Sequence, residues 1–334
     1  MADLPPAADA FLERFVAWAQ ARRDLRGALV VGSRARATEP ADALSDLDLL
    51  LVTTRPRFYA STRDWLGELG DVFLTCTYSS IVGTRAVRAA DFDVEGELLH
   101  VDFAIVGSLE ARMSGPLFRL LARCPGALRF LPPALRAEVG SWFAQLRKGR
   151  PRVLFERGRA ASRMIARAPL CAGGQRAPGA AEFDELVHSF LDLGLWQSKL
   201  LLRGELWMAL HFCDRLRKER LLRMLEWHAR ATREAPPDTW YEGRFLERWA
   251  DRRALAELGH AFGHFEGEDA WRALFATSRL FAWLARETAE RLGFPDPAAA
   301  EARVDRWLER RFAERAGERG GAGSSPSGSC PPGS

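Results

Sequence analysis

The first 110 or so residues alternate between short apolar runs and polar turns. Apolar residues recur at helical spacing in "PAADAFLERFVAWAQA", which predicts a helix from about residue 7 to 24. The stretch "STRDWLGELG" predicts a second helix that stops at Gly70. Strands are predicted for "GALVVGS", "DLDLLLVTT", "DVFLTCTY", "GTRAVRAADFD" and "LLHVDFAIV". We therefore expect a mixed α/β unit with a sheet of about four or five strands.

From about residue 110 the strand patterns give way to helical periods. Long helical stretches cover residues 181–231, 269–293 and 300–317, and the Gly/Ser/Pro-rich end of the chain is typical of disorder. The expected fold class is α+β. A domain with a mixed, twisted sheet flanked by helices occupies residues 1–110, a helical bundle domain residues 111–313, and a disordered tail residues 314–334.

Composition narrows the class of protein. Of the 334 residues, 47% are hydrophobic and 28% charged, which is typical of a soluble globular chain. No apolar run approaches the roughly 20 residues that span a bilayer, and the N-terminus lacks the basic start and apolar core of a signal peptide. The five cysteines are far apart and form no CxxC motif, which favours free thiols over disulfides or structural zinc. We expect a cytoplasmic protein with no membrane partner.

Charge is divided unevenly along the chain. Residues 1–110 carry 11 Arg and 17 Asp or Glu, a net charge of −6, so the remainder carries +10. Because an arginine-rich composition often reflects the genome, the basic pI is weak evidence for nucleic-acid binding, and nucleic acid is not the expected partner. The basic part can still face an anionic ligand. The sequence leaves the oligomeric state open.

Two aspartates stand at the entrance of the apolar run "LDLLLVTT". Because side chains in a strand alternate between faces, Asp46 and Asp48 are expected on one face, where their charges repel unless a cation lies between them. Hard carboxylate oxygens suit Mg²⁺. Asp102, in the later strand "LLHVDFAIV", supplies a third acid. An acid at a strand end is usually only solvated or caps a turn, but three acids in this order favour a site.

A Gly-Ser pair ends the strand before these acids. Gly32 has no side chain, so a phosphate can approach its backbone, and the Ser33 hydroxyl and the following N–H groups can donate to phosphate oxygens. A phosphate cradle beside a paired-acid metal site is what phosphoryl or nucleotidyl transfer requires. In such sites two metal ions lie roughly 3.5–4 Å apart.

The ordered set "LVVGS", twelve residues, "DLD" and then "HVDF" resembles the DNA polymerase β-type nucleotidyltransferase superfamily. More narrowly, "RDWLGELGDVF", "LWQSKLLLRGELWMALHFCDRLRKERLLRMLEWHAR" and "DAWRALFATSRLFAWLARETAERLGF" are similar to the aminoglycoside 6-adenylyltransferase (streptomycin adenylyltransferase) family. Together the similar parts reach from about residue 10 to 310. The resemblance implies a nucleotidyltransferase domain followed by a helical domain that contacts substrate and nucleotide.

The resemblance also assigns roles to residues. It implies that Asp46, Asp48 and Asp102 are the metal and catalytic acids, and that Gly32 and Ser33 contact the triphosphate. Lys199, before "RGEL", takes the place of a triphosphate partner in the family. From spacing alone, Lys199 and Arg203 share one helix face and could reach a nucleotide, although for Arg203 by itself a solvated surface cation is the preferred interpretation.

The segment before the third acid is rich in carboxylates, although it matches the family least well. It carries Asp91, Asp93, Glu95, Glu97 and Asp102 without Lys or Arg, which suits a cationic acceptor. Glu95 and Glu97 are alternatives to Asp102 as the base that activates the acceptor hydroxyl. For Glu205, an acceptor contact and a purely structural role are equally favoured. The basic second half does not favour a cationic acceptor.

The predicted activity is a nucleotidyl transfer with ATP as co-substrate and two Mg²⁺ ions. AMP would pass to a hydroxyl of a small molecule, an aminoglycoside such as streptomycin being favoured, with release of pyrophosphate and substrates in a cleft between the two domains. Two alternatives stay open: an adenylyltransferase acting on protein or RNA, and a catalytically inactive nucleotide-binding module. The presence of all three acids argues against the inactive module.

Overall fold

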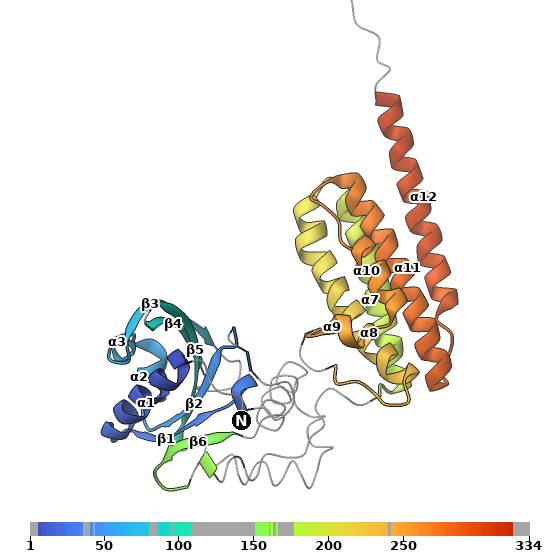
Figure 1. The fold of residues 1–334 in the computed structure, drawn as a ribbon. Helices are drawn as coiled ribbons and strands as arrows, with labels where there is room; N and C mark the ends of the chain where they lie inside the picture. Colours follow the sequence, from blue (N-terminus) through green and yellow to red (C-terminus); the bar gives the residue numbers. More distant parts are fainter. Residues whose placement is uncertain are drawn as a thin grey trace, which may run out of the picture. The chain divides into compact units, whose positions relative to one another are not determined.

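A computed structural model describes residues 6–35, 41–42, 44–79, 86–94, 96–108, 151–159, 161–162, 165, 177–239 and 242–322 (Figure 1). The chain divides into two compact units, Met1–Gly174 and Gln175–Ser334. Each unit has its own apolar core. The α+β fold class predicted from the sequence is confirmed: a mixed sheet flanked by helices is followed by a helical region.

The first unit is built around one sheet. Its strands within the described residues are β1 (Leu25–Val30), β2 (Leu47–Thr53), β3 (Asp71–Ser79), β4 (Ala86–Val94), β5 (Glu97–Gly107) and β6 (Arg152–Glu156), in the order β3-β4-β5-β2-β1-β6. The pair β2–β5 is parallel and the other neighbours are antiparallel. Within the described residues this unit also contains the helices α1 (Pro6–Ala21), α2 (Pro56–Ser61) and α3 (Asp64–Gly67) and the 3-10 turn η1 (Ser33–Ala35) (Figure 1).

One face of the sheet packs against the helices. Phe11 and Phe15 of α1 are fully buried and share a core with alternate residues of β5, among them Val101 and Phe103. This alternation follows from the period of two along a strand, which leaves His100 and Asp102 on the opposite face. The core therefore fixes which way the predicted site residue Asp102 and its neighbour His100 point.

Two expectations for this region were wrong. Strand patterns do not end near residue 110, because β6 adds an edge strand beside β1. Its sequence "RVLFE" hides this role, since within it only Phe155 is buried. The helix expected over residues 61–70 is shorter, because α3 covers only Asp64–Gly67. Ser61 is the last residue of the separate helix α2, and Thr62 between the two has an extended backbone (φ −100°, ψ 157°). Since β6 belongs with the sheet, we now propose a domain boundary nearer residue 174 than residue 110.

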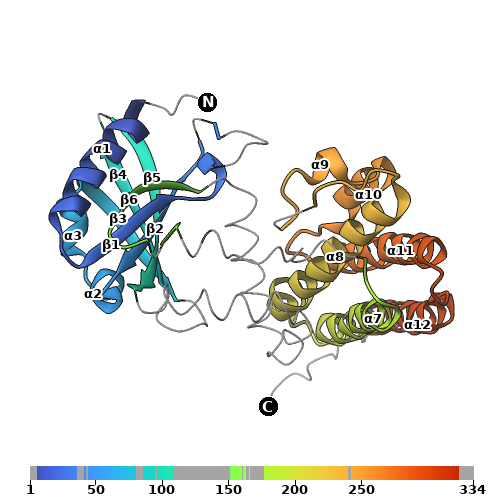
Figure 2. The ribbon, with the colours of Figure 1, turned by 90° about the horizontal axis from the view of Figure 1, so that it is seen from below.

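The second unit is helical within its described residues. Its elements are α7 (Ala180–Leu202), the π-helix η3 (Met208–Asp214), α8 (Arg215–Thr232), α9 (Leu246–Trp249), α10 (Arg252–Ala261), α11 (Gly267–Leu292) and α12 (Ala298–Ala322). Figure 2 shows α7, α8, α11 and α12 as neighbours within this unit. The rings of Phe190 on α7 and Phe281 on α11 stack at 3.7 Å in its core.

The ends of α11 follow ordinary capping rules. Glu266 accepts hydrogen bonds from the backbone N–H groups of Glu268 and Asp269, and Gly293 ends the helix with a left-handed backbone (φ 70°). The following helix corrects one expectation, because α12 continues to Ala322 and the first part of the tail expected from residue 314 is helical. Residues 323–334 lie outside the described residues. Within the described chain, no helix has the length and apolar character that crossing a membrane requires.

Candidate functional site

The sheet brings two of the three predicted acids together. Strands β2 and β5 pair in parallel with Leu47 opposite Val101 and Asp48 opposite Asp102. Leu47 and Val101 belong to the helix-covered core, so Asp48 and Asp102 lie side by side on the other face. Both carboxylates are only partly buried. Two acids in register on neighbouring strands could not be deduced from the sequence, which did not reveal the strand order.

Gly32 lies directly against Asp48. The Val31 N–H donates to the Asp48 carbonyl at 2.9 Å. Gly32 has a left-handed backbone (φ 68°), and a Cβ at this position would lie 1.8 Å from Oδ2 of Asp48. The sequence predicted that glycine is needed for a phosphate to approach. The structure supplies another reason: the carboxylate occupies the space that a side chain would fill.

Asp46 comes just before the start of β2 and is exposed. Arg34 of the η1 turn donates from Nε to the Asp46 carbonyl at 3.1 Å and from Nη2 to the Ser45 carbonyl. Ser45 in turn donates from its hydroxyl to Oδ1 of Asp42 at 2.8 Å. Arg34 thus ties the Gly-Ser segment to the entrance of β2. Arg34 is not among the residues predicted from the sequence, because an arginine in a polar loop carries no signal of its partners.

His100 links Asp102 to a further acid. Its Nδ1 lies 2.6 Å from Oδ1 of Asp91 on β4, and its Nε2 lies 3.4 Å from Oδ1 of Asp102. Asp91 and His100 are opposite each other in the β4–β5 register. Asp91 is one of the carboxylates predicted to suit a cationic acceptor, whereas no role is predicted for His100 from the sequence. A histidine two residues before an acid on a strand was the available signal, since both share one face.

Burial and neighbouring charges shift the pKa values of Asp102 and His100. Burial raises the pKa of Asp102 above its ordinary value; the positive charge of His100 opposes this, while the negative charge of Asp46 adds to it. Burial lowers the pKa of His100, but the hydrogen bond to Asp91 and the charges of Asp102, Asp91 and Asp46 outweigh burial, so this pKa is raised. Asp46, Asp91, His100 and Asp102 therefore form one electrostatic cluster.

The carboxylate oxygens at this site are of the kind that binds a magnesium ion. Asp48 and Asp102 offer carboxylate oxygens in register, and Mg²⁺ is usually bound through one or two carboxylates plus phosphates and water. Among the residues that the structure describes, however, no three His, Cys, Asp or Glu side chains are grouped closely enough to hold a metal ion. The predicted third ligand, Asp46, is thus not assembled with Asp48 and Asp102, and the metal site belongs to the proposals below.

The other predicted site residues are distributed over both units. Glu97 is exposed at the start of β5, opposite Val94, and Glu95 lies outside the described residues. Lys199 is exposed in the last turn of α7, and Arg203 caps that helix 4.0 Å from Glu205. A cation in the last turn also stabilises the helix dipole, so their placement fits a structural role as well as a ligand contact. Their functions stay predictions.

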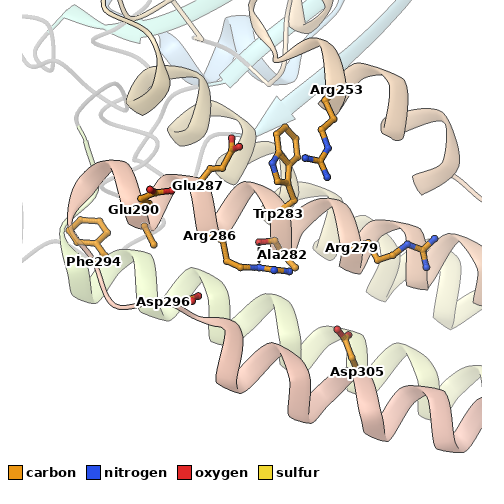
Figure 3. A pocket seen from close by; sticks show the side chains of 11 residues that line it. Arg253, Arg279, Ala282, Trp283, Arg286, Glu287, Glu290, Phe294, Asp296 and Asp305 are labelled. Carbon is orange, nitrogen blue, oxygen red and sulfur yellow. Dashed lines mark hydrogen bonds between the residues drawn. The ribbon is translucent and has the colours of Figure 1, made fainter.

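A pocket of about 670 Å³ lies within the second unit (Figure 3). Arg253 is stacked over the ring of Trp283 at 4.3 Å, and Arg286 and Glu287 contribute opposite charges to the lining. None of the described residues that line this pocket is among the predicted site residues. A lining of mixed charge does not select the triphosphate of a nucleotide.

Comparison with known proteins gives an extended sequence match. The sequence model of the streptomycin adenylyltransferase family matches residues 7–87 and 172–311, which is more than half of the chain. Aminoglycoside 6-adenylyltransferase of Bacillus subtilis (strain 168) is 24% identical over 122 residues. That match covers 36% of this chain and 43% of the relative, so it spans less than half of the relative's length.

Two solved structures are similar at low identity. The crystal structure of an aminoglycoside 6-adenyltransferase from Bacillus subtilis has 15% identity and a TM-score of 0.41, covering 92% of this chain and 99% of that chain. A nucleotidyltransferase-like protein from Exiguobacterium sibiricum 255-15 has 13% identity and a TM-score of 0.27, covering 86% and 77%.

Proposed function

Because the chain belongs to the streptomycin adenylyltransferase family, we propose that it transfers AMP from ATP to a hydroxyl group of an aminoglycoside such as streptomycin, with release of pyrophosphate. The observation that carries this proposal within the structure is the pairing of Asp48 with Asp102, with Gly32 packed against Asp48. The arrangement supports a reaction in which a phosphate group is positioned beside fixed carboxylates.

In this proposal Asp46, Asp48 and Asp102 would hold two Mg²⁺ ions, which would supply charge neutralisation for the triphosphate when bound. Asp48 and Asp102 are held rigidly by neighbouring strands, whereas Asp46 precedes β2 and is positioned through the contact of Arg34 with its carbonyl. Gly32 and Ser33 serve as triphosphate contacts. Rigid placement of this kind is how positioning contributes to phosphoryl transfer.

Asp102 is proposed as the residue that activates the acceptor. The hydroxyl oxygen forms a bond to the α-phosphorus of ATP, the bond from that phosphorus to the bridging oxygen of the pyrophosphate breaks, and the hydroxyl proton passes to Asp102. Glu97 and Glu95 remain alternatives for this proton transfer.

The acceptor is proposed to be cationic because the sheet face that carries Asp102 is acidic. Asp91 and Asp93 lie on β4 beside β5, two residues apart and in register with His100 and Leu98. Carboxylates at such a surface attract amino or guanidino groups of an aminoglycoside. Transfer to protein or RNA, or binding of nucleotide without catalysis, would be distinguished from this proposal by the acceptor experiment below.

Replacement of Asp48 tests the catalytic assignment. We expect Asp48→Ala to lower AMP transfer by about two or more orders of magnitude, because a carboxylate that binds the metal–nucleotide complex is lost, while the chain stays folded. Asp64→Ala is the matched control: Asp64 is an exposed acid of the same unit, in the first turn of α3. Turnover by Asp48→Ala equal to that of the control would contradict the site.

The acceptor is identified by incubating the full chain with ATP, Mg²⁺ and a panel of aminoglycosides led by streptomycin. Mass spectrometry should show the gain of one AMP on an aminoglycoside together with pyrophosphate. AMP found on added protein or RNA instead would support the alternative acceptors. Binding of ATP without pyrophosphate release across the whole panel would favour the inactive module.

A further inference from the structure

His100 is placed between two carboxylates on the face of the sheet that carries Asp102. The imidazole bridges neighbouring strands, with Nδ1 2.6 Å from Oδ1 of Asp91 and Nε2 3.4 Å from Oδ1 of Asp102. The cross-strand register places Asp91 directly opposite His100, so the backbone already sets the first of these contacts. About a third of the His100 side chain is exposed.

The second contact places a candidate hydrogen-bond donor, Nε2 of His100, near Asp102. Its Oδ1 atom is buried and has no hydrogen-bond partner among the described residues. A buried oxygen without a donor costs free energy, so a donor within reach is expected to serve it. Nε2 of His100 is at ion-pair distance but is not aligned for a hydrogen bond. Catalytic hydrogen bonds are often long in a ligand-free enzyme and tighten when substrates bind.

We propose that Asp91 and His100 act together as positioning residues for Asp102. Asp91 accepts from Nδ1–H and fixes the ring, and Nε2–H donates to Oδ1 of Asp102. The second oxygen of Asp102 is then free to face the reacting groups. The effect of this contact on catalysis rests on the proposed function. A supporting residue that orients a reacting carboxylate is expected to change activity by about 10–100-fold when lost.

Two substitutions separate the two ring nitrogens. The amide nitrogen of glutamine reaches the place of Nε2, whereas that of asparagine reaches the place of Nδ1. We expect His100→Asn to lower kcat by about 10–100-fold with little change in KM for ATP, and His100→Gln to retain kcat within about threefold of the wild type. Equal losses in both folded variants, or no loss in His100→Asn, would overturn the proposal.

A second histidine–aspartate pair provides the matched control. Nδ1 of His264 lies 2.9 Å from Oδ2 of Asp269 in the second unit, and the His264 side chain is 92% exposed. His264→Asn and His264→Gln should leave kcat unchanged. A loss in these variants similar to that of His100→Asn would show that the effect is not specific to the Asp102 contact.

A readout that does not depend on activity is given by the ring ¹⁵N signals of the histidines at one fixed pH. The His100 signals are assigned in the wild type by through-bond correlation to the His100 backbone amide. We expect Asp102→Asn to shift the Nε2 signal of His100 and to leave the Nδ1 signal nearly in place. An unchanged Nε2 signal would overturn the contact, even if the His100 variants fail to fold. If the wild type transfers no AMP, the proposed function fails, while these signals still decide the contact.

Discussion

At the scale of single residues, Gly32 shows why a sequence motif can be required for two reasons at once. Its left-handed backbone (φ 68°) favours glycine over any other residue. The Asp48 carboxylate also occupies the place of a side chain, with Oδ2 1.8 Å from where a Cβ would be. A substitution here must therefore either strain the backbone or displace a carboxylate that the proposed reaction needs.

Gly32→Ala is expected to lower both stability and activity. The left-handed backbone alone costs alanine about 1–2 kcal/mol, and moving Asp48 adds to this cost. Gly158→Ala is the control, since Gly158 has the same backbone hand (φ 89°) but nothing within 4 Å of an added Cβ. Urea unfolding and AMP-transfer rates should show a stability loss in both variants and an activity loss only in Gly32→Ala. Equal activity in the two would contradict the role of the Gly32–Asp48 contact.

At the scale of elements, strands and helices with a clear pattern of buried residues could be predicted from the sequence. Features that depend on the order of strands in the sheet could not. The strand at Leu47–Thr53 has a strong apolar run, and the helical stretches of the second unit repeat at the helical period. The strand β6 was missed because an edge strand with one buried residue has almost no pattern. The pairing of Asp48 with Asp102 required the parallel register of β2 and β5, which local sequence does not encode.

The contact of α11 with α12 also could not be predicted from the local sequence. Glu301 of α12 is 4% exposed, and neither of its carboxylate oxygens has a hydrogen-bond partner among the described residues. Arg286 of α11 lies 3.3 Å from Oε2 at ion-pair distance. Burial raises the pKa of Glu301 to about 7, against the opposing charge of Arg286. A glutamate in a helical sequence gives no sign of such burial.

This shift predicts how the second unit responds to pH. Between about pH 4.5 and 7 the unfolded chain has lost the Glu301 proton while the folded chain still binds it, so the contribution of Glu301 to stability falls as pH rises. Glu301→Gln removes this titration. Its free energy of unfolding, relative to the wild type, should be higher at pH 8 than at pH 5 by about 2–3 kcal/mol.

Urea unfolding of the full chain at both pH values measures this difference. Glu257→Gln serves as the control, because Glu257 is an exposed glutamate on α10 of the same unit. The control should show no comparable change between pH 5 and pH 8. A relative stability of Glu301→Gln that does not rise with pH would show that Glu301 is ionised in the folded chain at pH 5.

At the scale of the whole molecule, charge is divided along the chain. Residues 1–110 carry a net charge of −6 and include the paired acids, whereas the remaining residues carry +10. A cationic acceptor is drawn toward the acidic part by long-range attraction, and an anionic partner such as RNA toward the basic part. Salt weakens both attractions. The ligand whose binding depends on salt therefore shows which part of the chain binds the acceptor.

The proposed acceptor can therefore be tested by ionic strength. Raising NaCl from about 50 to 300 mM shortens the Debye length to well under 10 Å, so KM for streptomycin should rise several-fold while kcat stays nearly constant. An uncharged hydroxyl compound accepted by the enzyme provides the control and should show a salt-independent KM. A salt-independent KM for streptomycin would mean that the acidic surface near Asp102 does not bind the acceptor's cationic groups. If RNA binding depends steeply on salt and AMP is transferred to the RNA, the acceptor is RNA and the basic part of the chain binds it.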